Sequence, residues 1–247
     1  MDDSMVRAVE LPTGDDPQAR TGHPWDLPAI AALARGIALH PKVTYFVGEN
    51  GSGKSTLLEA IAIAAGINPE GGTSNFAFST RDSHSGLAGA IRLVRGLRRP
   101  RTDFFLRAES LFTAATYLDE LERADPGALA AYGGASLHEQ SHGESFLAVM
   151  LHRFGPDGFY VMDEPEAALS TQNCLTCLRR IHELASAGSQ FVIATHSPIV
   201  LAYPEATIYE CGPEGLTPTV YEDVPMVRLT ERFLADRRRF LDQLLHD

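Results

Sequence analysis

The stretch VTYFVGENGSGKST, residues 43–56, decides the fold of this chain. Its first five residues form a β-branched and aromatic run, which is typical of a strand covered on both faces. The next eight, GENGSGKS, match the pattern GxxxxGK[ST], and the residues that follow, up to Gly66, favour a helix. A strand, a glycine-rich turn and a helix in this order predict a P-loop, the turn that binds nucleotide phosphates.

The predicted loop gives each of its polar groups a role. The glycines let backbone N–H groups wrap around the β-phosphate of ATP, and the helix N-terminus adds its positive end. Lys54 is expected to reach the β- and γ-phosphates, and the Ser55 hydroxyl to ligate Mg²⁺. The alternative is an ordinary glycine-rich turn. The residues predicted to bind the nucleotide here are Gly48, Glu49, Asn50, Gly51, Ser52, Gly53, Lys54, Ser55 and Thr56.

Composition limits the classes of protein to consider. The 247 residues are 44% hydrophobic, which suffices for one α/β core, or for a core with a small subdomain. The formal net charge of -11 argues against a surface dominated by nucleic-acid binding. No apolar run reaches about 18 residues, so we expect no membrane-spanning helix, and the acidic N-terminus is unlike a secretory signal. With only three cysteines, the chain is expected in the cytoplasm.

Strands and helices alternate along the chain. Further buried strands are predicted at 159–162 and 191–195, a helix at about 171–186 between them, and a late hairpin around 212–215. A charged amphipathic helix over 229–245 closes the chain. This alternation predicts a mostly parallel, doubly wound α/β sheet with an antiparallel portion. We expect one domain over 1–247, with 66–140 as a helical or inserted subdomain.

Two adjacent carboxylates follow the strand predicted at 159–162. The end of a buried parallel strand places Asp163 and Glu164 at the sheet edge where ligands bind. Asp163 is expected to hold Mg²⁺ through water, and Glu164 to orient the attacking water or take its proton. The alternative is a solvated turn. At the end of the next strand, His196 is expected at the same edge, where it can contact the γ-phosphate.

The order of these motifs resembles that of the ABC-type ATPases, whose heads occur in transporters and in SMC, RecF and OLD-like proteins. The resemblance rests on GENGSGKST, on SHGES at 141–145, on VMDEPEAALS at 161–170 and on THSP at 195–198. More narrowly, DEPE with THSP is similar to the soluble predicted ATPases described as AAA family, or AAA_21-like. The resemblance implies a P-loop NTPase fold, with Glu164 and His196 as catalytic residues.

In this family the SHGES position is the signature, which faces the P-loop of a second subunit. The resemblance therefore implies that Ser141, Gly143 and Glu144 meet the ATP held by another copy. The expected partner is a second copy of the chain, joined head to tail as an isologous homodimer around two nucleotides. Read without the resemblance, SHGES is an ordinary helix N-cap with Glu144 in the first turn.

Two positions depart from the family pattern. His142 replaces the first glycine of the usual signature, and no glutamine lies between residues 56 and 139, where the Q-loop glutamine belongs. Glu109 is the candidate substitute as a metal or water contact. Trp25 is the candidate for stacking on adenine, or else a core residue.

Several functions remain open. The first is an ATPase that dimerises on ATP and acts on an unidentified protein or DNA partner. A transporter's ATP-binding subunit is disfavoured by DEPE and by the missing glutamine. A DNA-repair or mobile-element defence ATPase and a nucleotide sensor are the further alternatives. The arginines at 92, 95, 98, 99, 101 and 107 are interpreted as a solvated charged face rather than a partner surface.

Overall fold

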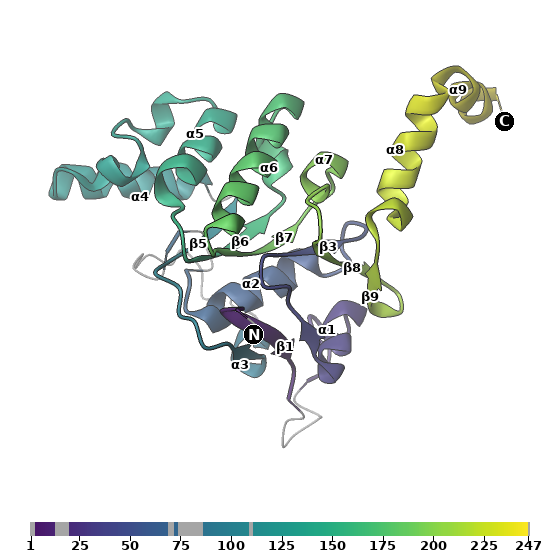
Figure 1. The fold of residues 1–247 in the computed structure, drawn as a ribbon, viewed down its shortest axis with the longest axis horizontal. Helices are drawn as coiled ribbons and strands as arrows, with labels where there is room; N and C mark the ends of the chain where they lie inside the picture. The colour runs from purple at the N-terminus through teal and green to yellow at the C-terminus, as the bar shows by residue number, and fades with distance from the viewer. Residues whose placement is uncertain (1–2, 13–19, 69–71, 74–85, 109–110, 247) are drawn as a thin grey trace.

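A mostly parallel sheet forms the middle layer of the molecule (Figure 1). The structure is a computed structural model and describes residues 3–12, 20–68, 72–73, 86–108 and 111–246. Over these residues the sheet has six strands in the order β5-β6-β7-β3-β8-β9. The strands are β3 (Val43–Val47), β5 (Thr102–Arg107), β6 (Gly158–Asp163), β7 (Gln190–Ala194), β8 (Thr207–Gly212) and β9 (Gly215–Thr219).

The strand directions bring the predicted site residues to one edge. Strands β5, β6, β7, β3 and β8 run parallel, and β9 returns antiparallel from β8 as the predicted hairpin. In the register of the sheet, Asp163 at the end of β6 lies beside Ala194 at the end of β7. Because the carboxyl ends of parallel strands share an edge, the phosphate loop after β3 and His196 after β7 meet the two carboxylates there.

Helices cover both faces of this sheet, which explains why β3, β6 and β7 are buried along their whole length. One face carries α2 (Lys54–Ala65), α1 (Pro28–Ala31) and α3 (Leu87–Ala90), with a small antiparallel sheet (Figure 1). That sheet has the order β2-β1-β4 and comprises β1 (Val6–Glu10), β2 (Ile37–Ala38) and β4 (Arg92–Arg95). The other face carries α4 (Leu111–Ala124), α5 (His142–Ala148), α6 (Thr171–Ser186) and α7 (Pro198–Leu201) (Figure 1).

The segment predicted as a helical subdomain, 66–140, contributes to several layers. The short helix α3 packs beside α2, strand β4 joins the small sheet, β5 forms one edge of the large sheet, and the long helix α4 begins at Leu111. Short 3-10 segments continue it at Ala128–Tyr132 and Leu137–Glu139. Whether the segment behaves as a separate unit stays a prediction.

The closing helix predicted over 229–245 is two helices, α8 (Pro225–Ala235) and α9 (Arg237–His246), which project away from the sheet (Figure 1). The break lies at Asp236, whose backbone is not helical, with φ -147° and ψ 78°. Its Oδ1 accepts a hydrogen bond from the Arg239 N–H at 3.1 Å. An Asp side chain that bonds the backbone three residues on starts a new helix rather than continuing the old one. No helix among the described residues is long and apolar enough to cross a membrane.

Candidate phosphate and metal site

The loop after β3 has the backbone that only glycine adopts without strain. Gly48, Gly51 and Gly53 have φ values of 142°, 80° and 95°. At Gly48 a Cβ atom would lie 2.4 Å from the carbonyl oxygen of Cys211, which is in the neighbouring strand β8. The first glycine of the motif is therefore required by a close approach of two backbones as well as by the turn itself.

Lys54 begins α2 and turns back into this loop. Its ammonium donates hydrogen bonds to the carbonyl oxygens of Gly48, at 2.8 Å, and Glu49, at 2.9 Å. The residue is only 4% exposed. A buried ammonium inside a turn at a helix N-terminus concentrates positive potential there, as a polyphosphate site requires.

The two residues predicted to hold the metal are in contact. The Ser55 hydroxyl donates to Oδ1 of Asp163 at 3.1 Å, and Asp163 is 6% exposed. A hydroxyl and a carboxylate are the oxygen ligands that Mg²⁺ accepts, and Mg²⁺ commonly completes its shell with water and substrate phosphates. The donor set fits Mg²⁺. Larger clusters of His, Cys, Asp and Glu suited to a metal do not occur in the described parts of the chain.

Glu164 starts a sharp turn directly after β6. Its φ of 48° is left-handed, and its N–H donates to the carbonyl oxygen of Ala194 at 3.0 Å. The Glu164 side chain is 40% exposed, and its Oε1 lies 3.4 Å from Nε2 of His196. That nitrogen is buried and makes no hydrogen bond to the described residues. A buried imidazole nitrogen directed at a carboxylate leaves a polar position that a water or phosphate oxygen would satisfy.

A third carboxylate, Glu166, was not predicted from the sequence. It accepts hydrogen bonds from residues of the histidine loop, which we define as residues 195–197 after β7. Glu166 accepts hydrogen bonds from the His196 N–H with Oε1 and from the Thr195 hydroxyl, at 2.8 Å, with Oε2. The Thr195 Oγ1 in turn accepts the Ser197 N–H at 3.0 Å. The signal was present in the sequence, because DEPE and THSP occur together and Glu166 is the second glutamate of DEPE.

Arg107 is a second residue that the sequence misplaced. It was interpreted as part of a solvated face, yet its side chain is 21% exposed and lies 3.3 Å from Oδ2 of Asp163. Other arginines of that group are paired on the surface, such as Arg101 with Asp157 at 3.7 Å. The solvated-face interpretation therefore fits Arg101, whose side chain is 81% exposed, and is wrong for Arg107.

The signature segment forms a capping box at the start of α5. Ser141 Oγ accepts the Glu144 N–H at 3.4 Å, while the Glu144 carboxylate accepts from the Ser141 N–H at 2.9 Å and from its hydroxyl at 2.6 Å. The hydrogen bonds from the Ser141 hydroxyl and backbone lower the pKa of Glu144. Gly143 packs tightly, since a Cβ there would lie 2.9 Å from the carbonyl oxygen of Ala168, after the DEPE turn.

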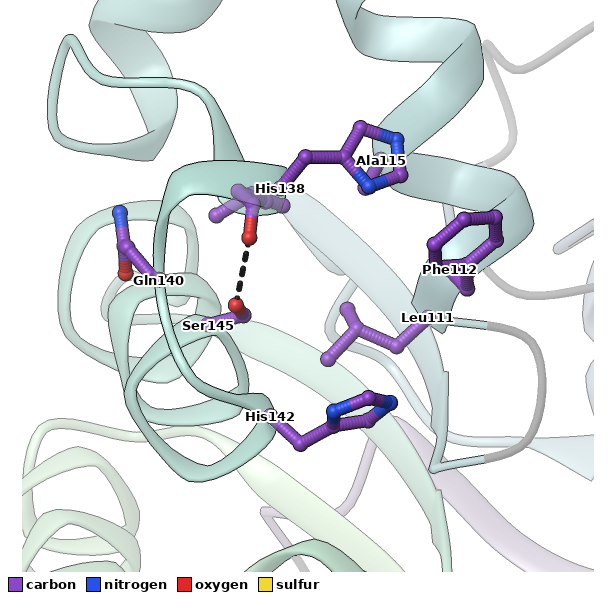
Figure 2. Close-up of a pocket in the computed structure, with 8 residues that line it drawn as sticks. Leu111, Phe112, Ala115, His138, Gln140, His142 and Ser145 are labelled. Carbon is purple, nitrogen blue, oxygen red and sulfur yellow. Dashed lines mark hydrogen bonds between the residues drawn. The ribbon is translucent and has the colours of Figure 1, made fainter.

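The structure does not bring this segment to the phosphate loop of its own chain. Helix α5 lies on the opposite face of the sheet from α2 (Figure 1), and none of residues 141–144 lines the cavities at the loop. Ser141 and His142 are exposed. Beside them is a small cavity of about 80 Å³ between α4 and the turn before α5. Figure 2 shows it bordered by Phe112, His138 and His142.

Two larger cavities adjoin the loop. One, of about 370 Å³, is lined by His23 and Leu27 together with loop residues and Glu164. The other, of about 500 Å³, lies between the loop, His196 and the start of α8. Trp25 lines neither; it packs at the edge of the core, with Arg20 5.5 Å above its ring. Glu109, the candidate substitute for the missing Q-loop glutamine, lies outside the described residues.

Comparison with known proteins finds one family that matches part of the chain, one distant relative in sequence and similar solved structures. Residues 34–93 match the family described as AAA domain (AAA_23). A Brefeldin A resistance protein of Schizosaccharomyces pombe is 24% identical over 188 residues, 69% of this chain, and the chain spans 12% of that protein.

Two solved structures are similar in fold. The SMC head domain from Thermotoga maritima is 17% identical at a TM-score of 0.42, covering 75% of this chain and 93% of that one. CbiO1 from Clostridium perfringens, part of the ABC transporter complex cbiONQ, is 17% identical at a TM-score of 0.48, covering 99% and 100%. The match over residues 34–93 includes the loop at 48–55, and the parallel sheet around that loop is the arrangement typical of a P-loop protein.

Proposed function

We propose that this chain binds ATP with Mg²⁺ and hydrolyses it, and that bound ATP joins two copies head to tail. The observation that carries the proposal is the meeting of Ser55, Asp163, Glu164 and His196 at one sheet edge beside the phosphate loop. The cytoplasm stays the expected compartment.

The residues at the carboxyl edge of the sheet have separate roles in the proposed hydrolysis. Lys54 and the loop N–H groups bind the phosphates, while Ser55 and Asp163 would hold Mg²⁺, which neutralises charge on the transferred phosphoryl group. Glu164 orients a water molecule for attack on the γ-phosphorus, with His196 beside it. The new P–O bond forms as the bond to the ADP oxygen breaks, and the water's protons leave through Glu164 or phosphate.

The position of the signature supports the proposed dimer. Helix α5, which begins at this segment, lies on the opposite face of the sheet from α2 (Figure 1), so we propose that a second copy supplies Ser141 and Gly143 to the loop. An exposed N-cap hydroxyl at the start of a helix can donate to an anion. In the structure this hydroxyl donates to Glu144, so contact with a phosphate requires Ser141 Oγ–H to turn away from that carboxylate. Contact between Glu144 itself and the nucleotide stays a prediction.

Replacing Glu164 with glutamine tests the proposal. Glu164→Gln keeps the size of the side chain but removes the base. The variant should therefore bind ATP without hydrolysing it, and the ATP-bound dimer should accumulate. Light scattering measures the mass, and a phosphate-release assay measures turnover. The matched control is Glu120→Gln, at an exposed position of α4. Normal turnover by a Glu164→Gln protein that stays monomeric with ATP would refute the proposal.

A further inference from the structure

We propose that Arg107 is a built-in counter-ion of the metal site. It pairs with Asp163 until nucleotide phosphate draws its guanidinium away, so that a divalent cation binds strongly only together with nucleotide. This inference rests on the proposed ATP site and adds a residue and a binding order to it.

The sheet places Arg107 beside the metal ligand. Arg107 is the last residue of β5, and in the parallel register it lies directly opposite Asp163, the last residue of β6. Residues paired in register direct their side chains to the same face of a sheet. Glu59 of α2, which covers that face, completes the group.

Contacts on three sides hold the guanidinium. One terminal nitrogen lies 3.3 Å from Oδ2 of Asp163, and the other lies 3.2 Å from Oε2 of Glu59. The guanidinium carbon lies 5.4 Å from the centre of the Phe105 ring. The planar fork of arginine reaches both carboxylates at once, which the single ammonium of lysine does less well.

The pairing leaves Asp163 with both oxygens engaged. Oδ1 accepts from Ser55 and Oδ2 faces Arg107, in a carboxylate that is 6% exposed. A metal ion that uses Asp163, directly or through water, therefore displaces one of these partners. It also meets the positive charge of Arg107, which lines the same cavity of about 290 Å³ as Ser55, Asp163 and Glu164.

Nucleotide changes this balance of charge. A terminal phosphate beside Ser55 offers Arg107 a more highly charged acceptor than Asp163, and arginine binds phosphate through paired hydrogen bonds. Glu59 tethers the other side of the guanidinium while it moves. Asp163 then becomes available to the cation that accompanies the nucleotide.

The test measures Mn²⁺ binding, because free Mn²⁺ is counted directly by electron paramagnetic resonance. Wild type should bind MnCl₂ weakly alone and tightly with a non-hydrolysable ATP analogue. Arg107→Gln and Arg107→Met, both neutral, should bind Mn²⁺ without nucleotide about tenfold more tightly than wild type, since removal of a neighbouring positive charge favours a cation. Arg107→Lys, which keeps the charge, should stay close to wild type.

The control is Arg101→Gln, which removes the same charge just before the other end of β5, where the side chain is 81% exposed. It should not alter Mn²⁺ affinity. Thermal unfolding with and without MnCl₂ gives a second readout, in which the neutral variants gain more stability than wild type even if they are less stable initially. Equal Mn²⁺ affinity and equal Mn²⁺ stabilisation in wild type and both neutral variants would overturn the inference. Binding of the ATP analogue, measured separately, reports on the proposed function by itself.

Discussion

Replacing Glu166, which accepts hydrogen bonds from the histidine loop, tests how His196 is positioned in this site. Glu166 accepts a hydrogen bond from the His196 N–H and one from the Thr195 hydroxyl. Glu166→Ala removes both acceptors and leaves a donor on the fully buried Thr195 without its partner. The phosphate loop, including Lys54, does not contact Glu166 through any hydrogen bond found in the described residues.

The size of the effect follows from these bonds. Each hydrogen bond to a charged group contributes about 1.5–3 kcal/mol to stability. Because Glu166 is partly exposed, we take the lower value for each bond, which gives about 3 kcal/mol for the two bonds together. If about 2 kcal/mol of this loss falls on the placement of His196, turnover drops about 30-fold. Glu166→Gln keeps one acceptor oxygen, so it should lose about 1.4 kcal/mol and about tenfold in turnover.

Three measurements separate this positioning role from general damage. Phosphate release gives kcat, a fluorescent ATP analogue gives nucleotide affinity, and thermal unfolding reports on the fold, with Glu120→Ala on α4 as the exposed control. We expect kcat to fall while nucleotide affinity changes little, because the loop is untouched. Wild-type kcat in a folded Glu166→Ala protein would refute the reasoning. An equal loss of affinity and kcat would show instead that the glutamate supports the whole site.

Four further outcomes are expected. Gly48→Ala should destabilise the fold by about 1–3 kcal/mol and abolish nucleotide binding, because its Cβ would collide with the carbonyl of Cys211; unfolding curves and analogue binding check this. Ser141→Ala should cost about 1 kcal/mol of stability, whereas Ser141→Asn keeps a cap, and both should lose the ATP-dependent dimer. In Ser141→Ala the pKa of Glu144 should rise toward its ordinary value in an NMR titration. In the folded wild type this pKa is lowered, so the ionised Glu144 stabilises the fold above its ordinary pKa. That stabilisation is lost as the pH falls through the lowered pKa. Burial raises the pKa of Cys211 to about 12, so mass spectrometry should find this thiol unalkylated by iodoacetamide in mild alkali until the protein is unfolded.

The sequence predicted those parts of the molecule whose pattern is local. GENGSGKS is a backbone requirement within a single turn, so it is visible without any partner. The strand Val43–Val47 and the helix Thr171–Ser186 were likewise predicted at their observed bounds. A strand covered on both faces needs a continuous apolar run, and a helix against a sheet needs an amphipathic period, and both are read from neighbouring residues. The break at Asp236 was missed because the helical period continues through it.

The sequence by itself determined that this chain has a phosphate loop, an acidic pair and a histidine after successive buried strands. Only the tertiary structure decided what else meets them. Sheet order places β5 next to β6, and that adjacency, invisible in the sequence, puts Arg107 on Asp163. The physical reason is that ion pairs and buried hydrogen bonds depend on distances across the sheet, whereas residue patterns report only on neighbours along the chain.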